Sequence, residues 1–149
     1  MDIPLLSQWR KRHATPRGFA VFGSAQGGPD PAMLAELLGE CPMLRARAAD
    51  DGVELDDSAA SLSALDQLVP NWRDEEEQTL DRLGNDAGLY LGTVVVRTVP
   101  GATWHVWPNG HPVVRLASGR EIDPVEVGHT WAENGSPELS QVLAEVSEE

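Results

Sequence analysis

Cysteine and long apolar runs are scarce in this sequence, and each scarcity argues against a class of protein. The single cysteine, Cys41, cannot form an internal disulfide, which argues against a disulfide-stapled secreted domain. Cys41 lies in an apolar stretch, so we expect a buried, unreactive thiol. No segment reaches the roughly 20 apolar residues that cross a membrane, and the first residues lack a signal-peptide pattern. We therefore expect a cytoplasmic protein.

Positive charge is scarce as well. Eleven basic residues stand against 24 acidic ones, and the formal net charge is −13. A surface of this sign repels nucleic acid and anionic lipid, so we expect no nucleic-acid partner. The same charge favours either solubility alone or a basic protein partner. No sequence motif indicates a cofactor.

The 149 residues suit one domain, and a hydrophobic fraction of 41% is enough for a core. The charge is unevenly distributed along them. Residues 1–17 hold four basic residues against Asp2, a net +3, so the rest of the chain carries −16. We predict a basic amphipathic segment over 1–17 and a single acidic α+β domain over 18–147.

Caps, prolines and apolar spacing predict helices in both halves of the chain. A short strand at Phe19–Phe22 and a loop at Gly23–Pro29 are expected near the N-terminus. Gly84 is expected to end the helix predicted at Trp72–Leu83. The predicted helices are Pro4–His13, Pro31–Gly39, Pro42 to Ala48, one from the Asp57-Ser58 cap to Leu68, Trp72–Leu83, Pro124 to Glu133 and Pro137–Val146.

The clearest strand signals come later. Thr103–Trp107 and Pro112–Leu116 flank the turn sequence Pro108-Asn109-Gly110, which predicts a hairpin, and Arg120–Ile122 adds a third strand. The predicted fold is therefore α+β, with N-terminal helices, a small antiparallel meander at about 103–122 and C-terminal helices packed on it.

The segment between the N-terminal helices and the predicted meander has two possible secondary structures. Thr93–Val96 is β-branched and scores as a strand, but the apolar spacing from Leu89 to Val99 also suits a buried helix.

Three stretches carry a family resemblance: IPLLSQWRKRHATPRGFAVF from Ile3, LGNDAGLYLG from Leu83, and PNGHPVVRLASGREID from Pro108. With them the chain resembles a family of small acidic proteins of unknown function from high-GC Gram-positive bacteria. More loosely, the YLG segment with Arg97, Trp104 and Ile122-Asp123-Pro124 is similar to a bacterial domain of unknown function, sometimes found near toxin-immunity genes. That resemblance implies a helix over Asp86–Thr98 and assigns no activity.

Three histidines are weak candidates for a chemical site. His105, His111 and His129, with Asp123, could bring imidazoles and a carboxylate, which zinc accepts, to one sheet edge, although their spacing matches no standard metal motif. The same set could serve acid–base chemistry, with Ser118 as the nearest nucleophile. No G-x-S-x-G sequence surrounds Ser118, so a β-turn is the better interpretation.

Tryptophans and acidic runs are the candidate binding residues. Trp104 and Trp107 are three residues apart and cannot face the same side of a regular strand, so we expect one in the core and one exposed. An exposed tryptophan is a candidate contact residue. The acidic blocks Asp50–Asp57 and Asp74–Glu77 predict a solvated or partner-binding face. The second block consists of Asp74, Glu75, Glu76 and Glu77.

The N-terminal segment combines an apolar side with basic residues. Trp9, Arg10, Lys11 and Arg12 could contact an anionic membrane surface, a second partner or the acidic body of the protein itself.

These features together favour a non-enzymatic protein-interaction module, of adaptor or toxin-neutralising type, that uses an acidic surface. The alternatives are a metal-dependent or hydrolytic enzyme centred on the three histidines, and a peripheral membrane protein that binds through residues 3–12.

Overall fold

The computed structural model describes residues 31–148. The helix expected at 4–13, the strand at 19–22, the loop at 23–29 and the candidate contact residues 9–12 lie outside this part of the chain. The boundary proposed between residues 17 and 18 lies outside it too.

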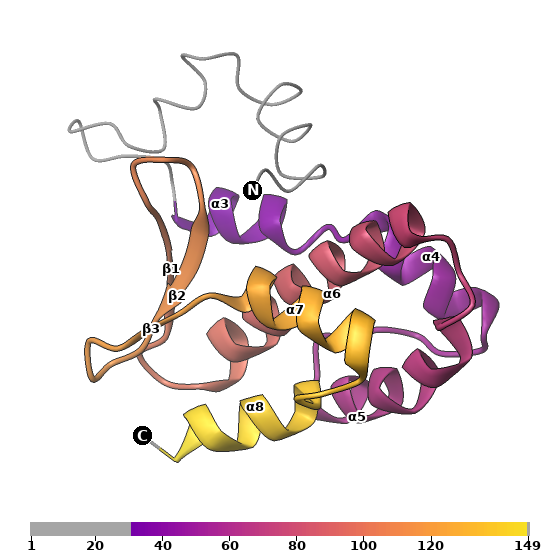
Figure 1. Cartoon of the computed structure of the whole chain (residues 1–149). Coiled ribbons are helices and arrows are strands. Elements are labelled where there is room, and N and C mark those ends of the chain that lie inside the picture. The colour runs from indigo at the N-terminus through magenta and orange to yellow at the C-terminus, as the bar shows by residue number, and fades with distance from the viewer. Residues whose placement is uncertain (1–30, 149) are drawn as a thin grey trace.

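Six α-helices, one 3₁₀ turn and three strands make up the described residues (Figure 1). The elements are α3 (Pro31–Leu38), α4 (Pro42–Asp50), α5 (Ala59–Leu68), η1 (Val69–Trp72), α6 (Glu77–Thr98), β1 (Thr103–Val106), β2 (Pro112–Arg115), β3 (Glu121–Ile122), α7 (Pro124–Asn134) and α8 (Leu139–Ser147). The α+β architecture predicted from the sequence is confirmed. Between residues 31 and 148, no helix has both the length and the apolar character needed to span a membrane.

The sheet is the predicted meander, in the order β1-β2-β3 with both pairs antiparallel. Trp104 pairs with Val114, and Val114 pairs with Ile122. The backbone N–H of Gly110 donates to the carbonyl of Trp107, which closes the turn between β1 and β2. Side-chain caps also start two helices as expected: Ser58 accepts from the N–H of Ser61, and Asp123 accepts from that of Glu126.

The long helix α6 lies at the centre of the fold, in contact with every other described helix and with the sheet (Figure 1). It runs without a break from Glu77 to Thr98. Two sequence predictions were therefore wrong. Gly84 does not end a helix, and the helix expected from Trp72 begins only at Glu77, after the 3₁₀ turn. The helical interpretation of Asp86–Thr98 is confirmed, because burial of its apolar residues outweighs the β-propensity of Thr93–Val96.

α6 has a glycine at position 84 because α7 packs so closely there that a side chain would not fit. A methyl group at Gly84 would press on Gly128 and Ala132 of α7, and one at Gly88 would overlap the backbone of Pro124 and Val125. The two helices thus touch backbone to backbone. Glycine ordinarily costs a helix about 1 kcal/mol relative to alanine, and close packing offsets that cost here.

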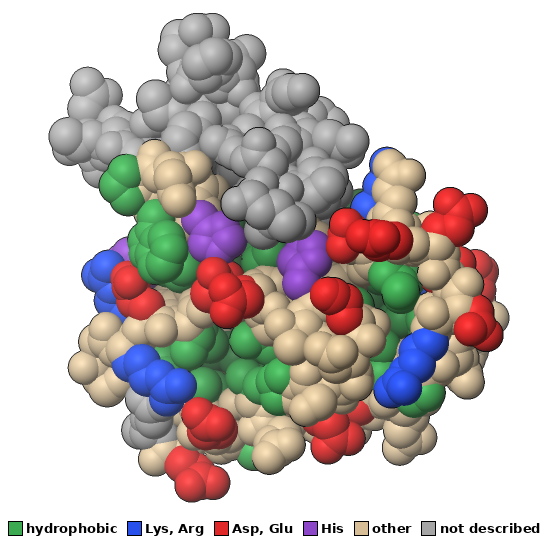
Figure 2. Space-filling view, viewed as in Figure 1, with side chains coloured by type: hydrophobic (Ala, Val, Ile, Leu, Met, Phe, Trp, Pro, Cys, Tyr) green, Lys and Arg blue, Asp and Glu red, His purple; other side chains and the backbone are tan. Residues whose placement is uncertain are grey.

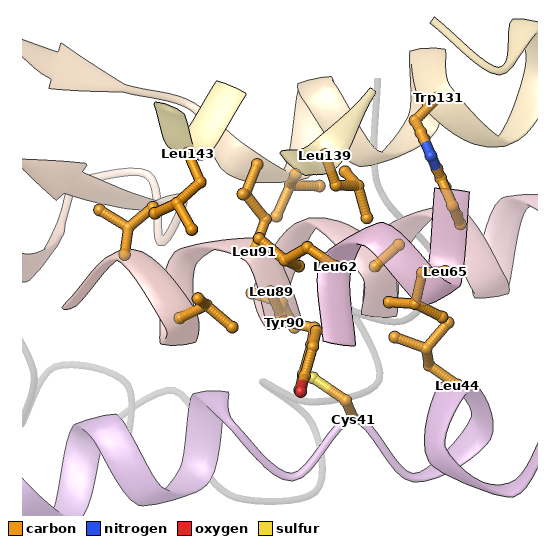
Figure 3. Packing of buried hydrophobic residues seen from close by; sticks show 14 of the residues in the cluster. Cys41, Leu44, Leu62, Leu65, Leu89, Tyr90, Leu91, Trp131, Leu139 and Leu143 are labelled. Atoms are coloured by element: carbon orange, nitrogen blue, oxygen red, sulfur yellow. The ribbon is translucent and has the colours of Figure 1, made fainter. Parts of the chain in front are cut away.

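The core surrounds α6 on several sides (Figure 3). Tyr90 and Leu91 of α6 are fully buried, as are Leu44 of α4, Leu62 of α5 and Leu139 of α8. Each such side chain contributes about 1.5–3 kcal/mol through burial. Cys41 is buried in the same cluster, and burial raises the pKa of its thiol well above the usual value, as expected for an unreactive cysteine.

A buried carboxylate holds the start of α4. Oδ2 of Asp86 accepts hydrogen bonds from the backbone N–H groups of Met43 and Leu44, at 3.0 and 3.1 Å. Asp86 therefore does the work of a helix cap from 42 residues away in the sequence, while the local cap residue Cys41 offers no side-chain hydrogen bond to the helix. Burial raises the pKa of Asp86 from 3.8 to about 6, against the opposing effect of the two N–H donors.

Gly88→Ala tests the contact between α6 and α7. We expect a loss of about 3 kcal/mol in the free energy of unfolding, because the added methyl group meets backbone that cannot move aside. Urea denaturation measures this loss. The matched control is Ala46→Gly on the exposed side of α4, which should cost only about 1 kcal/mol. A Gly88→Ala variant as stable as the wild type would contradict the packing described above.

Asp86→Asn tests the ionisation of the buried cap. Because folding raises the pKa of Asp86, its contribution to stability is complete below pH 4 and is lost as the pH rises through 6. Asparagine keeps an accepting oxygen but does not ionise. From pH 4 to pH 7 we expect the stability of the variant relative to the wild type to rise by about 2 kcal/mol.

Urea denaturation across that pH range gives this difference, with the exposed Asp50→Asn as control. A difference between wild type and Asp86→Asn that stays constant with pH would show that Asp86 does not titrate there.

Candidate binding site

A row of polar side chains runs along α6 at residues spaced four apart: Glu77, Asp81 and Asn85. Residues with this spacing lie on neighbouring turns of the same helix face. Glu77 is exposed, Asp81 is half-buried and Asn85 is 1% exposed. The row thus leads from solvent into the protein.

Asn85 is the least explained polar residue of the described chain. Both atoms of its side-chain amide, Oδ1 and Nδ2, are buried, and no residue in 31–148 hydrogen-bonds either of them. Leaving such a group unpaired costs about 1–3 kcal/mol. The sequence patterns did not single out Asn85, although an asparagine within a glycine-rich helical stretch was a usable signal.

His129 of α7 lies beside this row. Its Nδ1 is 3.8 Å from Oδ1 of Asp81. Asn85 is one turn after Asp81 on the same face of α6. Burial lowers the pKa of His129 despite the nearby carboxylates, among them Asp81 and Asp123. Its Nε2 is buried without a hydrogen bond to any residue in the described range.

Trp104 and His111 approach from the β1–β2 hairpin. The Trp104 ring rests on Gly92, two turns beyond Asn85 on the same side of α6, and its buried Nε1 makes no hydrogen bond within residues 31–148. Nε2 of His111 lies 2.8 Å from Oδ2 of Asp123, a distance typical of an ion pair, without the angles of a hydrogen bond. Asp123 caps α7 and so joins the hairpin side to the α7 side. We call these residues the Asn85 cluster: Asp81, Asn85, Trp104, His111, Asp123 and His129.

Two of the three candidate histidines therefore lie in this cluster, and the third does not. His105 is on the other face of the sheet, with Nε2 3.2 Å from Oγ1 of Thr103. Burial and the charge of Arg115 lower its pKa.

Within residues 31–148 no three histidine, cysteine, aspartate or glutamate side chains meet in an arrangement that could hold a metal ion. Figure 2 shows histidine and acidic side chains close together on the face that includes α7.

The two tryptophans of the hairpin divide as their spacing predicts. Trp104 is 8% exposed, whereas Trp107 is 39% exposed just beyond the end of β1. Nε1 of Trp107 donates to Oε1 of Glu121, and its ring lies 5.6 Å from that of His111. Trp104 is thus part of the core, and of the two only Trp107 is available as a surface contact.

The two acidic blocks, far apart in the sequence, meet in the structure. Arg47 of α4 pairs with both Asp51 and Glu75, and Asp51 also accepts a hydrogen bond from Nε1 of Trp72. Acidic side chains gather at the end of the molecule where α4 and the start of α6 lie (Figures 1 and 2). We call this the acidic surface: Asp50, Asp51, Asp74, Glu75, Glu76 and Glu77.

Ser118 and the depression beside Arg45 are better explained by structural roles than by binding. Ser118 lies in the turn between β2 and β3, where its Oγ accepts from the N–H of Arg120 and Gly119 closes the turn to Leu116. A shallow depression of about 320 Å³ is lined partly by Arg45. The Arg45 guanidinium already donates to three backbone carbonyls and to Asp57, so it has little capacity left for a ligand.

Comparison with known proteins identifies the family of this chain but no activity. No curated protein and no solved structure matches the chain. A family of unknown function (DUF6278) matches residues 1–149, which is the whole of it. The chain therefore belongs to this family of unknown function.

Proposed function

We propose that this protein is a non-enzymatic protein-interaction module, of adaptor or toxin-neutralising type, which binds a basic partner through its acidic surface. The observation that supports the proposal best is the convergence of two sequence-distant acidic blocks around Arg47. A protein that needed only solubility would have no reason to gather like charges, because their repulsion lowers stability.

The charge count of the described residues points the same way. Residues 31–148 contain 21 acidic and seven basic side chains. Five of the seven arginines are already paired with carboxylates of the protein itself: Arg45, Arg47, Arg97, Arg115 and Arg120. Asp74, Glu76 and Glu77 remain exposed at the start of α6. Their charge would steer a basic partner and increase its association rate.

Trp107 offers a second contact of a different kind. It presents an exposed aromatic ring on the hairpin, and tryptophan commonly contributes a large share of interface energy. A partner that covers Trp107 would gain apolar contact in addition to charge. We place this interaction in the cytoplasm, where a lone buried cysteine is unremarkable.

Charge neutralisation of the acidic surface tests the proposal. Partners captured from a lysate of the source organism at low salt are identified, purified and measured for affinity. We expect the triple variant Asp74→Asn, Glu76→Gln, Glu77→Gln to bind about tenfold more weakly at low salt. High salt should reduce the difference, because it screens exposed charges.

The matched control neutralises three exposed glutamates elsewhere, in Glu133→Gln, Glu138→Gln and Glu148→Gln. It removes the same net charge from α7 and the C-terminal end. If both triple variants lose the same affinity for the partner, the effect depends on net charge and not on the acidic surface. If neither variant loses affinity, the acidic surface does not bind the partner.

A further inference from the structure

Strand β1 forms one edge of the sheet, and its only hydrogen-bonded neighbour in the described sheet is β2. The N–H of Trp107, just after β1, donates to the carbonyl of His111. Pro112, which has no N–H to donate, lies opposite Val106. Because hydrogen-bonded and non-hydrogen-bonded pairs alternate along an antiparallel ladder, the N–H and C=O groups of Trp104 and Val106 point away from β2.

This edge lies at the surface and lacks the usual protection of an edge strand. The β1–β2 hairpin is at one side of the molecule (Figure 1). Thr103 is exposed, and His105 and Val106 are half-buried. Helix α3 contacts β1, but no residue in 31–148 hydrogen-bonds the outward backbone groups of Trp104 and Val106. The strand contains no proline, lysine or bulge, and an edge of this kind is a template for another strand.

We propose that β1 pairs antiparallel with β1 of a second copy of this chain, about a twofold axis beside His105. In this register Trp104 is opposite the second copy's Val106, so the outward N–H and C=O groups of each copy meet their complements on the other. The two small sheets would join into one continuous sheet. The two His105 residues would lie opposite each other at its centre.

The chemistry of the edge fits a second copy better than a basic partner. The side chains of β1 are those of threonine, tryptophan, histidine and valine, which offer no carboxylate to a basic segment. The nearby charges of Arg115 and Glu121 already pair with each other. Two copies therefore meet at β1 without repulsion between facing carboxylates, and the backbone pattern complements itself.

Introduced cysteines test the register. Residues opposite each other in a non-hydrogen-bonded pair have Cα atoms about 4.5 Å apart, a separation that a disulfide can span. We therefore expect His105→Cys to form a covalent dimer under mild oxidation. The matched control is Thr103→Cys, whose two copies would be about 13 Å apart along the strands and should stay uncoupled. Cys41 is buried and does not compete.

The backbone pairing has its own test in Val106→Pro. This change removes an N–H that faces away from β2, so the sheet of each copy keeps its own hydrogen bonds. Val106→Ala is the matched control, because it also removes the valine side chain but keeps the N–H. In sedimentation velocity we expect the proline variant to dimerise about tenfold more weakly than the alanine variant.

Salt distinguishes this contact from binding at the acidic surface. Each copy carries a net charge of −13, so two copies repel each other at long range. Added salt screens that repulsion and should strengthen the dimer, whereas it should weaken binding of a basic partner. A dimer that salt weakens would contradict pairing at an edge without carboxylates.

The remaining outcomes decide the proposal without affecting the proposed function. If His105→Cys forms no covalent dimer, or forms it no faster than Thr103→Cys, the proposed register is wrong. If Val106→Pro and Val106→Ala dimerise equally well, the copies meet through another surface. A wild-type chain that sediments as a 16.1 kDa monomer at every concentration overturns the proposal outright.

Discussion

Backbone contact between α6 and α7 at Gly84, Gly88 and Gly128 is the constraint on which the rest of the structure depends. It brings the two helices closer than any side chain would permit, and it fixes α7 along one side of the central helix. The sheet and the remaining helices then cover the other sides of α6. As a consequence, His129 lies beside Asp81, and the α7 cap Asp123 lies within reach of the hairpin residue His111.

Polar groups inside the fold divide into those that are satisfied and those that are not. Oδ2 of Asp86 holds the start of α4, although its Oδ1 is buried without a hydrogen bond to any residue in 31–148. The hydroxyl of Tyr90 accepts from the N–H of Asp57 and contacts Ser61. These groups stabilise the protein through contacts far apart in sequence. Asn85 is next to Asp86 in the sequence but points to another side of α6, where no described residue pairs with it. Asp86 thus has a structural role through Oδ2, whereas no contact within residues 31–148 accounts for the amide of Asn85.

Local signals in the sequence predicted much of this fold. The hairpin turn at 108–110 and the caps Ser58 and Asp123 all form as expected, because each depends only on neighbouring residues. Gly84 was misjudged for the opposite reason. A glycine after an apolar helical stretch is the usual helix-ending signal, and only knowledge of α7, more than 40 residues later, shows that it serves close packing.

The candidate site was predictable only in part. Spacing alone indicated that one of Trp104 and Trp107 would be buried, but could not tell which. It could not show that His111 and His129 would lie near Asp123 while His105 faced away, nor that the acidic blocks would meet at Arg47. These placements depend on the path of the chain between distant elements, which single-residue patterns do not encode.

Native-state hydrogen exchange along α6 tests the central claim most directly. If one continuous helix is held against α7 by its glycines, the backbone amides from Gly84 to Val95 should exchange slowest in the protein, at the rate set by global unfolding. Fast exchange at Gly84 and Asn85, with protected segments on either side, would show two separate helices and contradict the account.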